Sequence, residues 1–227
     1  MKSSFVKIAS SKKCDFIVGI QGSGKSSFFR GLFDCPYPKD FPYDYICIDY
    51  CKELYGKDNA RVIEEMNRRL EYHIERGLPF CYETASLGDT KQYKRIKREG
   101  YAIHIQFLFI YPIEKAMDRI KRGFERHERH DIAKNLEKLD SDQKILLDKL
   151  AWHILNNDIV TIHDNSEDVA LSALQLANKP VAQFESGELV WRADAKEILS
   201  PELRSFLKNY KYGRNTGKII VFKSENQ

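Results

Sequence analysis

Short apolar runs alternate with amphipathic stretches along most of the chain. The apolar runs predict buried strands at residues 16–20, 45–48, 80–82, 104–111 and 158–163. Apolar residues spaced by three and four predict a helix that begins near Lys25 and further helices at residues 59–76, 90–99, 113–126 and 141–156. Strands that alternate with helices pair in parallel through crossover connections. The pattern therefore predicts a doubly wound α/β fold with a mainly parallel, five-stranded sheet and helices on both faces.

The C-terminal part of the chain has a different pattern. Two β-rich runs in "VAQFESGELVWR" flank Ser186 and Gly187, which predicts a small β-hairpin at the edge of the sheet. We expect residues 1–13 to be a leader, residues 14–190 to form one domain and residues 191–227 to be a C-terminal extension. The sequence leaves open whether "YKYGRNTGKIIVFK" in that extension packs on the domain or binds a partner.

The composition indicates a soluble protein. Hydrophobic residues make up 42% and charged residues 31% of the 227 residues, and no apolar run approaches the roughly 20 residues that a membrane helix needs. Five cysteines without CxxC spacing or a secretory signal favour a reducing compartment, so we expect a cytoplasmic protein with no membrane partner. The net charge of +4 favours phosphorylated ligands, but it is too small to indicate a nucleic-acid partner and does not exclude one.

A glycine-rich turn lies between the first predicted strand and the first predicted helix. Its residues satisfy GxxxxGK[ST], the pattern of a P-loop, in which main-chain N–H groups and a helix N-terminus bind phosphates. Lys25 is expected to reach the β- and γ-phosphates, and the Ser26 hydroxyl to bind Mg²⁺. No NKxD-like segment for guanine is present, so we expect ATP, with GTP left open. The predicted nucleotide-binding residues here are Gly19, Gln21, Gly22, Ser23, Gly24, Lys25, Ser26 and Ser27.

Two acidic residues follow predicted strands. Asp49 comes just past the second strand, at the edge where open α/β sheets bind ligands, and its carboxylate could take the proton of an acceptor hydroxyl or merely cap a helix. Glu83 ends the third strand and could orient the acceptor or hold Mg²⁺ through water. Thr84 is a candidate for substrate binding, although it or Ser86 could instead cap the following helix.

A basic stretch, "DRIKRGFERHERH", follows the 104–111 strand. Arg119, Arg122 and Arg126 recur at steps of three and four, so they can share one helix face. A guanidinium group near the transferring phosphoryl group would stabilise the charge of the transition state, and a solvated helix face is the alternative. His127 and His130 have no cysteine or acidic cluster beside them, so we predict no zinc site.

Taken together, these segments resemble the zeta-toxin-like P-loop kinases. The resemblance rests on "GIQGSGKSS", on "CIDY", on "YETAS" for that family's "ETT(L)S", on "EGYAIHIQFLFIYPIEKAMDRI" and on "HDNS", and it covers roughly residues 14 to 190. It implies transfer of the ATP γ-phosphate to a sugar hydroxyl, such as that of UDP-N-acetylglucosamine, by a toxin restrained by an antitoxin. By this likeness Asp49 is the base, Glu83 contacts the acceptor, Arg119 and a second arginine form a lid, and the loop of Asp164, Asn165 and Ser166 lies near the nucleotide.

The chain also departs from that family. "ERHERHDIAKNLEKL" lacks the family's glycine pair and its later arginine, so the lid is expected to be built differently, and "ETA" has lost a hydroxyl of "ETT". Two alternative functions stay open. One is a nucleotide-dependent binding module or switch. The other is a polynucleotide 5′-hydroxyl kinase, for which Tyr93, Tyr101 and the lysines of "KQYKRIKREGY" could line a groove.

Overall fold

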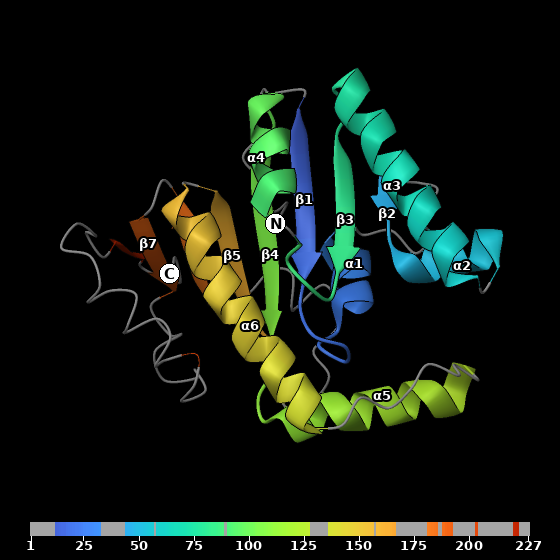
Figure 1. Ribbon diagram of the computed structural model, residues 1–227. Helices are drawn as coiled ribbons and strands as arrows, with labels where there is room; N and C mark the ends of the chain where they lie inside the picture. The colour runs from blue at the N-terminus through green and yellow to red at the C-terminus, as the bar shows by residue number, and fades with distance from the viewer. Residues whose placement is uncertain are drawn as a thin grey trace.

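The protein is built around one mixed β-sheet. The computed structural model describes residues 12–32, 44–56, 58–88, 90–127, 136–156, 158–166, 181–185, 188–192, 203 and 220–222. In this part of the chain the strands form an eight-stranded sheet in the order β2-β3-β1-β4-β5-β6-β7-β8 (Figure 1). The non-consecutive neighbours at the start of this order show that crossover connections join the first strands.

Five neighbouring strands of this sheet are parallel, as the sequence predicts. They are β1 (Lys13–Val18), β2 (Asp44–Ile46), β3 (Phe80–Thr84), β4 (Ala102–Phe109) and β5 (Ile159–Asp164). The central strand β1 pairs with β3 on one side and with β4 on the other. Because the strands are parallel, their carboxyl ends meet at one edge of the sheet, and the loops that follow them lie close together.

The predicted hairpin extends this sheet. Strands β6 (Ala182–Glu185) and β7 (Glu188–Arg192) are antiparallel, with Glu185 opposite Glu188, and β6 pairs with β5. A further strand, β8 (Ile220–Phe222), pairs in parallel with β7 and was not predicted. Strand β7 runs through residue 190, where the sequence places the end of the domain, so that boundary stays a prediction.

The helices largely follow the predicted ranges. They are α1 (Lys25–Leu32), α2 (Ile48–Tyr55), α3 (Asn59–Arg76), α4 (Thr90–Arg98), α5 (Ile113–His127) and α6 (Leu136–Leu155). The prediction for α3 was accurate because its ends are capped. The Asp58 side chain accepts a hydrogen bond from the N–H of Ala60 (3.0 Å), and Gly77 is left-handed, with φ 64°.

Helix α2 corrects the predicted strand at residues 45–48. Strand β2 ends at Ile46, and Ile48 is the first residue of the helix. The Cys47 thiol occupies the N-cap position and accepts a hydrogen bond from the N–H of Tyr50 (3.4 Å). Apolar Ile48 therefore continues the hydrophobic run in the sequence but not the strand, because a cap immediately precedes it. Helix α6 also begins earlier than predicted, at Leu136.

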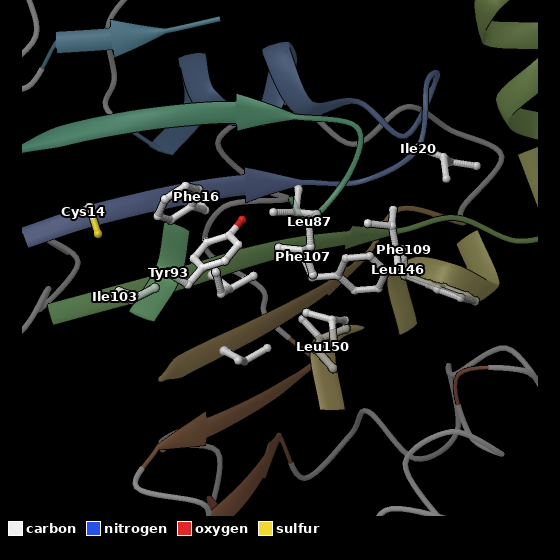
Figure 2. Close-up of a cluster of buried hydrophobic side chains, with 14 of the residues drawn as sticks. Cys14, Phe16, Ile20, Leu87, Tyr93, Ile103, Phe107, Phe109, Leu146 and Leu150 are labelled. Atoms are coloured by element: carbon white, nitrogen blue, oxygen red, sulfur yellow. The ribbon is translucent and has the colours of Figure 1, made fainter. Parts of the chain in front are cut away.

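Helices cover both faces of the sheet, as predicted. On one face, buried residues of α3, α4 and α6 pack on the strands, and Tyr93 lies among Phe16, Leu87 and Phe107 (Figure 2). The other face is covered by α1, whose Phe28 and Phe29 pack on apolar residues of the strands and of the N-cap of α2. These last residues are Ile17, Tyr45, Cys47, Cys81 and Leu108.

Two global features of the described residues bear on the sequence predictions. No helix among them is long and apolar enough to cross a membrane. Cys14, Cys47, Cys51 and Cys81 are buried free thiols. Burial raises the pKa of Cys14 and Cys81 well above the ordinary value, and it raises that of Cys47 to about 12. The thiols of Cys14, Cys47 and Cys81 therefore stay protonated at neutral pH and pack as small apolar side chains.

Candidate nucleotide-binding site

The glycine-rich turn lies between β1, which ends at Val18, and α1, which begins at Lys25. This is the strand–turn–helix context that the motif requires. Gly22 and Gly24 have φ values of +81° and +95°, a conformation that other residues rarely adopt. A Cβ atom on Gly22 would lie 2.4 Å from the Ala116 carbonyl oxygen. The turn therefore needs glycine both for its backbone and for its close packing on α5.

Lys25 folds back over the turn that precedes it. Its Nζ atom donates a hydrogen bond to the Ile20 carbonyl oxygen (3.1 Å), and the same oxygen accepts the N–H of Ser23 (3.2 Å). The ammonium group thus lies beside the main chain of the turn. Of the other predicted residues, Ser23 is buried, Gln21 is half-buried and Ser27 is exposed.

Asn165 links the turn to the loop after β5. This buried residue donates a hydrogen bond from Nδ2 to the Ser23 carbonyl oxygen (2.9 Å). Its main-chain N–H donates to the Phe109 carbonyl oxygen (2.9 Å), so the loop is also attached to the end of β4. Asn165 of this loop therefore lies against the glycine turn. Contact of Asn165 with a nucleotide stays a prediction.

Helix α5 brings one of the predicted arginines to this loop. Arg119 is half-buried and donates a hydrogen bond from Nη2 to the Asn165 carbonyl oxygen (2.9 Å). Burial, and then the neighbouring charge of Arg122, lower the pKa of Arg119. The guanidinium group stays protonated near neutral pH, because its ordinary pKa is above about 12. A second cation, the Lys115 ammonium group, donates to the Ser166 carbonyl oxygen.

Within the described part of the chain, the second arginine, Arg122, is bonded to its own helix and not to this loop. Arg122 is exposed, and its Nε donates to the Asp118 carbonyl oxygen of its own helix (3.3 Å). The backbone of Arg126 belongs to α5, but its side chain lies outside the described residues. Catalytic roles for Arg119, Arg122 and Arg126 all stay predictions. Arg119 lies against the loop after β5 through its bond to Asn165.

Glu83 contacts the first turn of α1, directly after the glycine-rich turn. It lies near the end of β3, and in register it is paired with Ile17 of β1. Ser26 donates its hydroxyl proton to the Glu83 carboxylate, with 3.3 Å from Oγ to each carboxylate oxygen. The phenol of Tyr45 donates to Oε2 of the same carboxylate. The Glu83 carboxylate therefore joins β2, β3 and α1 at the carboxyl edge.

Tyr45 is a site residue that the sequence did not reveal. Its contact with Glu83 depends on β2 lying next to β3, and the sequence does not specify this order of strands. A tyrosine near the end of a short apolar run is equally typical of an ordinary core residue. The only available signal was its position at the carboxyl edge of a strand, where ligands bind.

Thr84 uses its hydroxyl in the turn after β3. The hydroxyl donates to the Ser86 carbonyl oxygen (2.7 Å) and accepts the Ser86 N–H (3.1 Å). Helix α4 begins only at Thr90, so this hydroxyl closes a local turn and does not cap the helix. Binding of a substrate by Thr84 stays a prediction.

Asp49 is the second residue of α2 and is half-buried. It follows the end of β2 closely, which places it at the carboxyl edge of the sheet, as expected. An acidic residue in the first turn also stabilises a helix by facing its positive end. Its proposed role as a base therefore stays a prediction that kinetics must test.

The oxygen atoms gathered beside the turn fit a magnesium ion. Mg²⁺ prefers hard oxygen ligands and takes one or two from the protein, with the rest from phosphates and water. The Ser26 hydroxyl and the Glu83 carboxylate supply such atoms on adjacent elements. The described residues contain no cluster of three or more His, Cys, Asp and Glu side chains that could hold a metal ion, and a site of this type does not need one.

No protein-family model and no curated protein matches the chain. Solved structures are similar to it at low identity. A structure of the PezAT toxin–antitoxin system of Streptococcus pneumoniae has 13% identity and a TM-score of 0.49, and covers 89% of this chain and 86% of its own. A sugar kinase from Janibacter sp. HTCC2649 has 16% identity and a TM-score of 0.41, with 73% and 90% covered. A candidate kinase from Chloroflexus aurantiacus has 12% identity and a TM-score of 0.43, with 57% and 75% covered. These likenesses concern the fold alone.

Proposed function

We propose that the chain is an ATP-dependent kinase that transfers the γ-phosphate to a hydroxyl group of a small molecule. The observation that carries the proposal is the glycine turn with Lys25 folded over it and Ser26 bonded to Glu83. Positive φ values at Gly22 and Gly24 turn the main chain as a phosphate-binding nest requires. The N-terminus of α1 adds a positive helix end to that nest.

Lys25 is the residue that would hold the outer phosphates. Its ammonium group lies 3.1 Å from a carbonyl oxygen of the turn, and it can exchange this neutral acceptor for a charged phosphate oxygen, which binds it more strongly. Arg119 would add a second cation near the transferred group through its attachment to Asn165. Both charges then stabilise the transition state, in which negative charge is spread over the phosphoryl oxygens.

Ser26 and Glu83 would hold the magnesium ion. The Ser26 hydroxyl donates a hydrogen bond to Glu83, so the lone pairs of its oxygen are available to a cation. When bound, Mg²⁺ neutralises the β- and γ-phosphate oxygens. The anionic Glu83 carboxylate also lies on this side of the turn and favours a cation there.

Asp49 would act as the general base. The acceptor hydroxyl loses its proton to the carboxylate, its oxygen forms a bond to the γ-phosphorus, and the bond between that phosphorus and the bridging oxygen breaks, releasing ADP. The position of Asp49 just after β2, at the carboxyl edge of the sheet, supports this role.

The proposed class of acceptor rests on the sequence resemblance alone. The motifs shared with zeta-toxin-like kinases favour a nucleotide sugar such as UDP-N-acetylglucosamine, and with it the role of a toxin that a partner antitoxin restrains. The altered stretch "ERHERHDIAKNLEKL" runs from the end of α5 to the start of α6, and its middle part, residues 128–135, lies outside the described residues, so the lid of that family cannot be compared there.

The test is transfer of label from γ-labelled ATP. The protein is incubated with Mg²⁺ and, in separate reactions, UDP-N-acetylglucosamine, a metabolite extract and a 5′-hydroxyl oligonucleotide. We expect a labelled small molecule with the wild type and none with Lys25→Ala, while Asp49→Asn binds ATP and transfers little. A labelled oligonucleotide would identify a polynucleotide kinase instead. Label on no acceptor, together with partner binding that changes with the nucleotide, would favour a switch and overturn the proposal.

A further inference from the structure

Tyr45 is buried at the carboxyl edge of the sheet and has its hydroxyl on the Glu83 carboxylate. Only 5% of the residue is exposed, and the phenol donates its hydrogen bond to Oε2 of Glu83. The same carboxylate accepts the hydroxyl proton of Ser26, the predicted magnesium ligand. Tyr45 is thus connected to the predicted magnesium ligand Ser26 through one residue, Glu83.

The ring of Tyr45 is also held in place, by a contact with another ring. It is stacked on the ring of Phe29, with 3.6 Å between the ring centroids and 12° between the planes. Phe29 belongs to α1 and comes three residues after Ser26, so both lie on one side of that helix. Helix α1 therefore carries Ser26 and, through Phe29, also positions the ring of Tyr45. The hydroxyl of Tyr45 in turn contacts Glu83, the residue to which Ser26 is bonded.

The Tyr45 hydroxyl is the donor of this hydrogen bond, because a phenol carries a proton on its oxygen and a carboxylate does not. With a donor on Oε2 and the Ser26 hydroxyl on the same carboxylate, rotation of the Glu83 carboxylate is restricted.

We propose that Tyr45 is a positioning residue for the magnesium subsite. It holds the Glu83 carboxylate in the orientation that accepts the hydrogen bond of the Ser26 hydroxyl, so that the oxygen atoms of both side chains stay in place for the metal. The inference rests on the proposed function, because it concerns the metal that accompanies the nucleotide. It predicts that loss of the phenol hydroxyl weakens metal-dependent binding and leaves metal-independent binding unchanged.

The variant Tyr45→Phe isolates this role. It removes the donor and keeps the ring that stacks on Phe29. Tyr82→Phe is the matched control, since Tyr82 lies next to Glu83 in β3 but packs against the core on the opposite face of the sheet. Thermal unfolding of both variants shows whether the fold is retained.

The readout is the affinity for ADP, measured by calorimetry on the full chain with Mg²⁺ and with EDTA. In the wild type, Mg²⁺ is expected to increase the affinity. Tyr45→Phe should reduce this gain by about tenfold, the size expected for one hydrogen bond to a charged group. It should leave the affinity in EDTA unchanged, and Tyr82→Phe should alter neither value. Binding of Mn²⁺ in the presence of ADP, followed by electron paramagnetic resonance, should weaken in parallel.

A double-mutant cycle tests whether Tyr45 acts through Glu83. Glu83→Gln should reduce the Mg²⁺-dependent gain by itself, and adding Tyr45→Phe should cause little further loss, because the carboxylate to be positioned is no longer there. The inference would be overturned if the two substitutions reduced the Mg²⁺-dependent gain in ADP affinity additively. It would also be overturned if Tyr45→Phe kept the same Mg²⁺-dependent gain as the wild type. If the wild type binds ADP more tightly with Mg²⁺ and Tyr45→Phe does so equally, only the positioning role fails. If the wild type shows no nucleotide binding, the proposed function fails with it.

Discussion

The side-chain amide of Asn165 donates a 2.9 Å hydrogen bond to the main-chain carbonyl oxygen of Ser23, although 142 positions separate the two residues. The bond joins the loop after β5 to the middle of the glycine turn. The carbonyl oxygen of Asn165 also accepts a hydrogen bond from Arg119. One buried residue therefore connects the turn that would bind phosphates with an arginine that would stabilise their charge.

Asn165→Ala should loosen the glycine turn. The substitution removes the donor to Ser23 and leaves a main-chain carbonyl oxygen unpaired in a buried place, which typically costs about 1–3 kcal/mol. We expect ATP affinity to fall by about tenfold, measured by calorimetry. Asn67→Ala, on the exposed side of α3, is the control and should bind ATP as the wild type does. Unchanged affinity in Asn165→Ala would show that the turn keeps its shape without this bond.

Gly24→Ala should reduce nucleotide binding more than Asn165→Ala does. The residue has φ +95°, and an added Cβ would lie 2.6 Å from Nδ2 of Asn165, so both the backbone and the neighbour would have to shift. A non-glycine residue in such a conformation costs about 1–3 kcal/mol. Denaturation by urea should show this loss, and nucleotide binding should disappear. At Gly88, where the nearest atom to a Cβ is the end of a flexible Gln92 side chain at 3.4 Å, alanine should be tolerated. Equal effects at the two glycines would refute the argument.

Arg119→Ala tests whether the half-buried arginine takes part in phosphoryl transfer. Loss of a cation that stabilises a developing charge typically reduces kcat by about 100-fold or more. We expect such a fall in kcat, with a smaller change in the KM for ATP, in steady-state kinetics with the identified acceptor. Arg98→Ala, on the exposed end of α4, is the charge-matched control. A normal kcat in Arg119→Ala would leave the arginine with a structural role only.

Asp15 should make the stability of the fold depend on pH in the acid range. Burial alone would raise the pKa of this carboxyl group, but the hydrogen bond and charge of His104 (3.1 Å) and the charge of Lys13 (3.2 Å) outweigh it and hold the pKa below its ordinary value. The buried thiol of Cys81 also faces this carboxylate and stays neutral.

A carboxylate with a lowered folded pKa contributes stability above its unfolded pKa of about 3.9, and the contribution is lost as the pH falls through the folded value. Asp15→Asn should therefore lose about 1–3 kcal/mol at pH 7 and show a shallower decline below about pH 4 than the wild type. Urea denaturation from pH 3 to pH 7 measures both. Parallel pH profiles for the two proteins would mean that Asp15 does not titrate with folding.

Some of these features could be predicted because their causes are local in sequence. The turn of residues 19–24 was evident from its glycines, and α3 from the spacing of its apolar residues, with Asp58 and Gly77 capping its ends. The hairpin of β6 and β7 followed from a Ser-Gly pair between two β-rich runs. Each depends on a few neighbouring residues whose conformational preferences act in the same direction.

Other features could not be predicted, since they depend on contacts between distant segments. The bond between Tyr45 and Glu83 exists because β2 lies beside β3, and no local pattern specifies that order. Helix α2 was missed because Cys47 is an uncommon N-cap and Ile48 continued an apolar run. Strand β8 is only three residues long, and its pairing with β7 is a tertiary contact. The position of Asn165 was expected only through the family resemblance.

The most direct measurement is a calorimetric titration of the full chain with a non-hydrolysable ATP analogue and Mg²⁺, repeated with Lys25→Ala and with the control Lys94→Ala on the exposed side of α4. The account predicts saturable 1:1 binding by the wild type and by the control, and a loss of about 100-fold or more in affinity for Lys25→Ala, because the charge facing the outer phosphates is removed. Binding that is unaffected by Lys25→Ala, or no binding by the wild type, would contradict it.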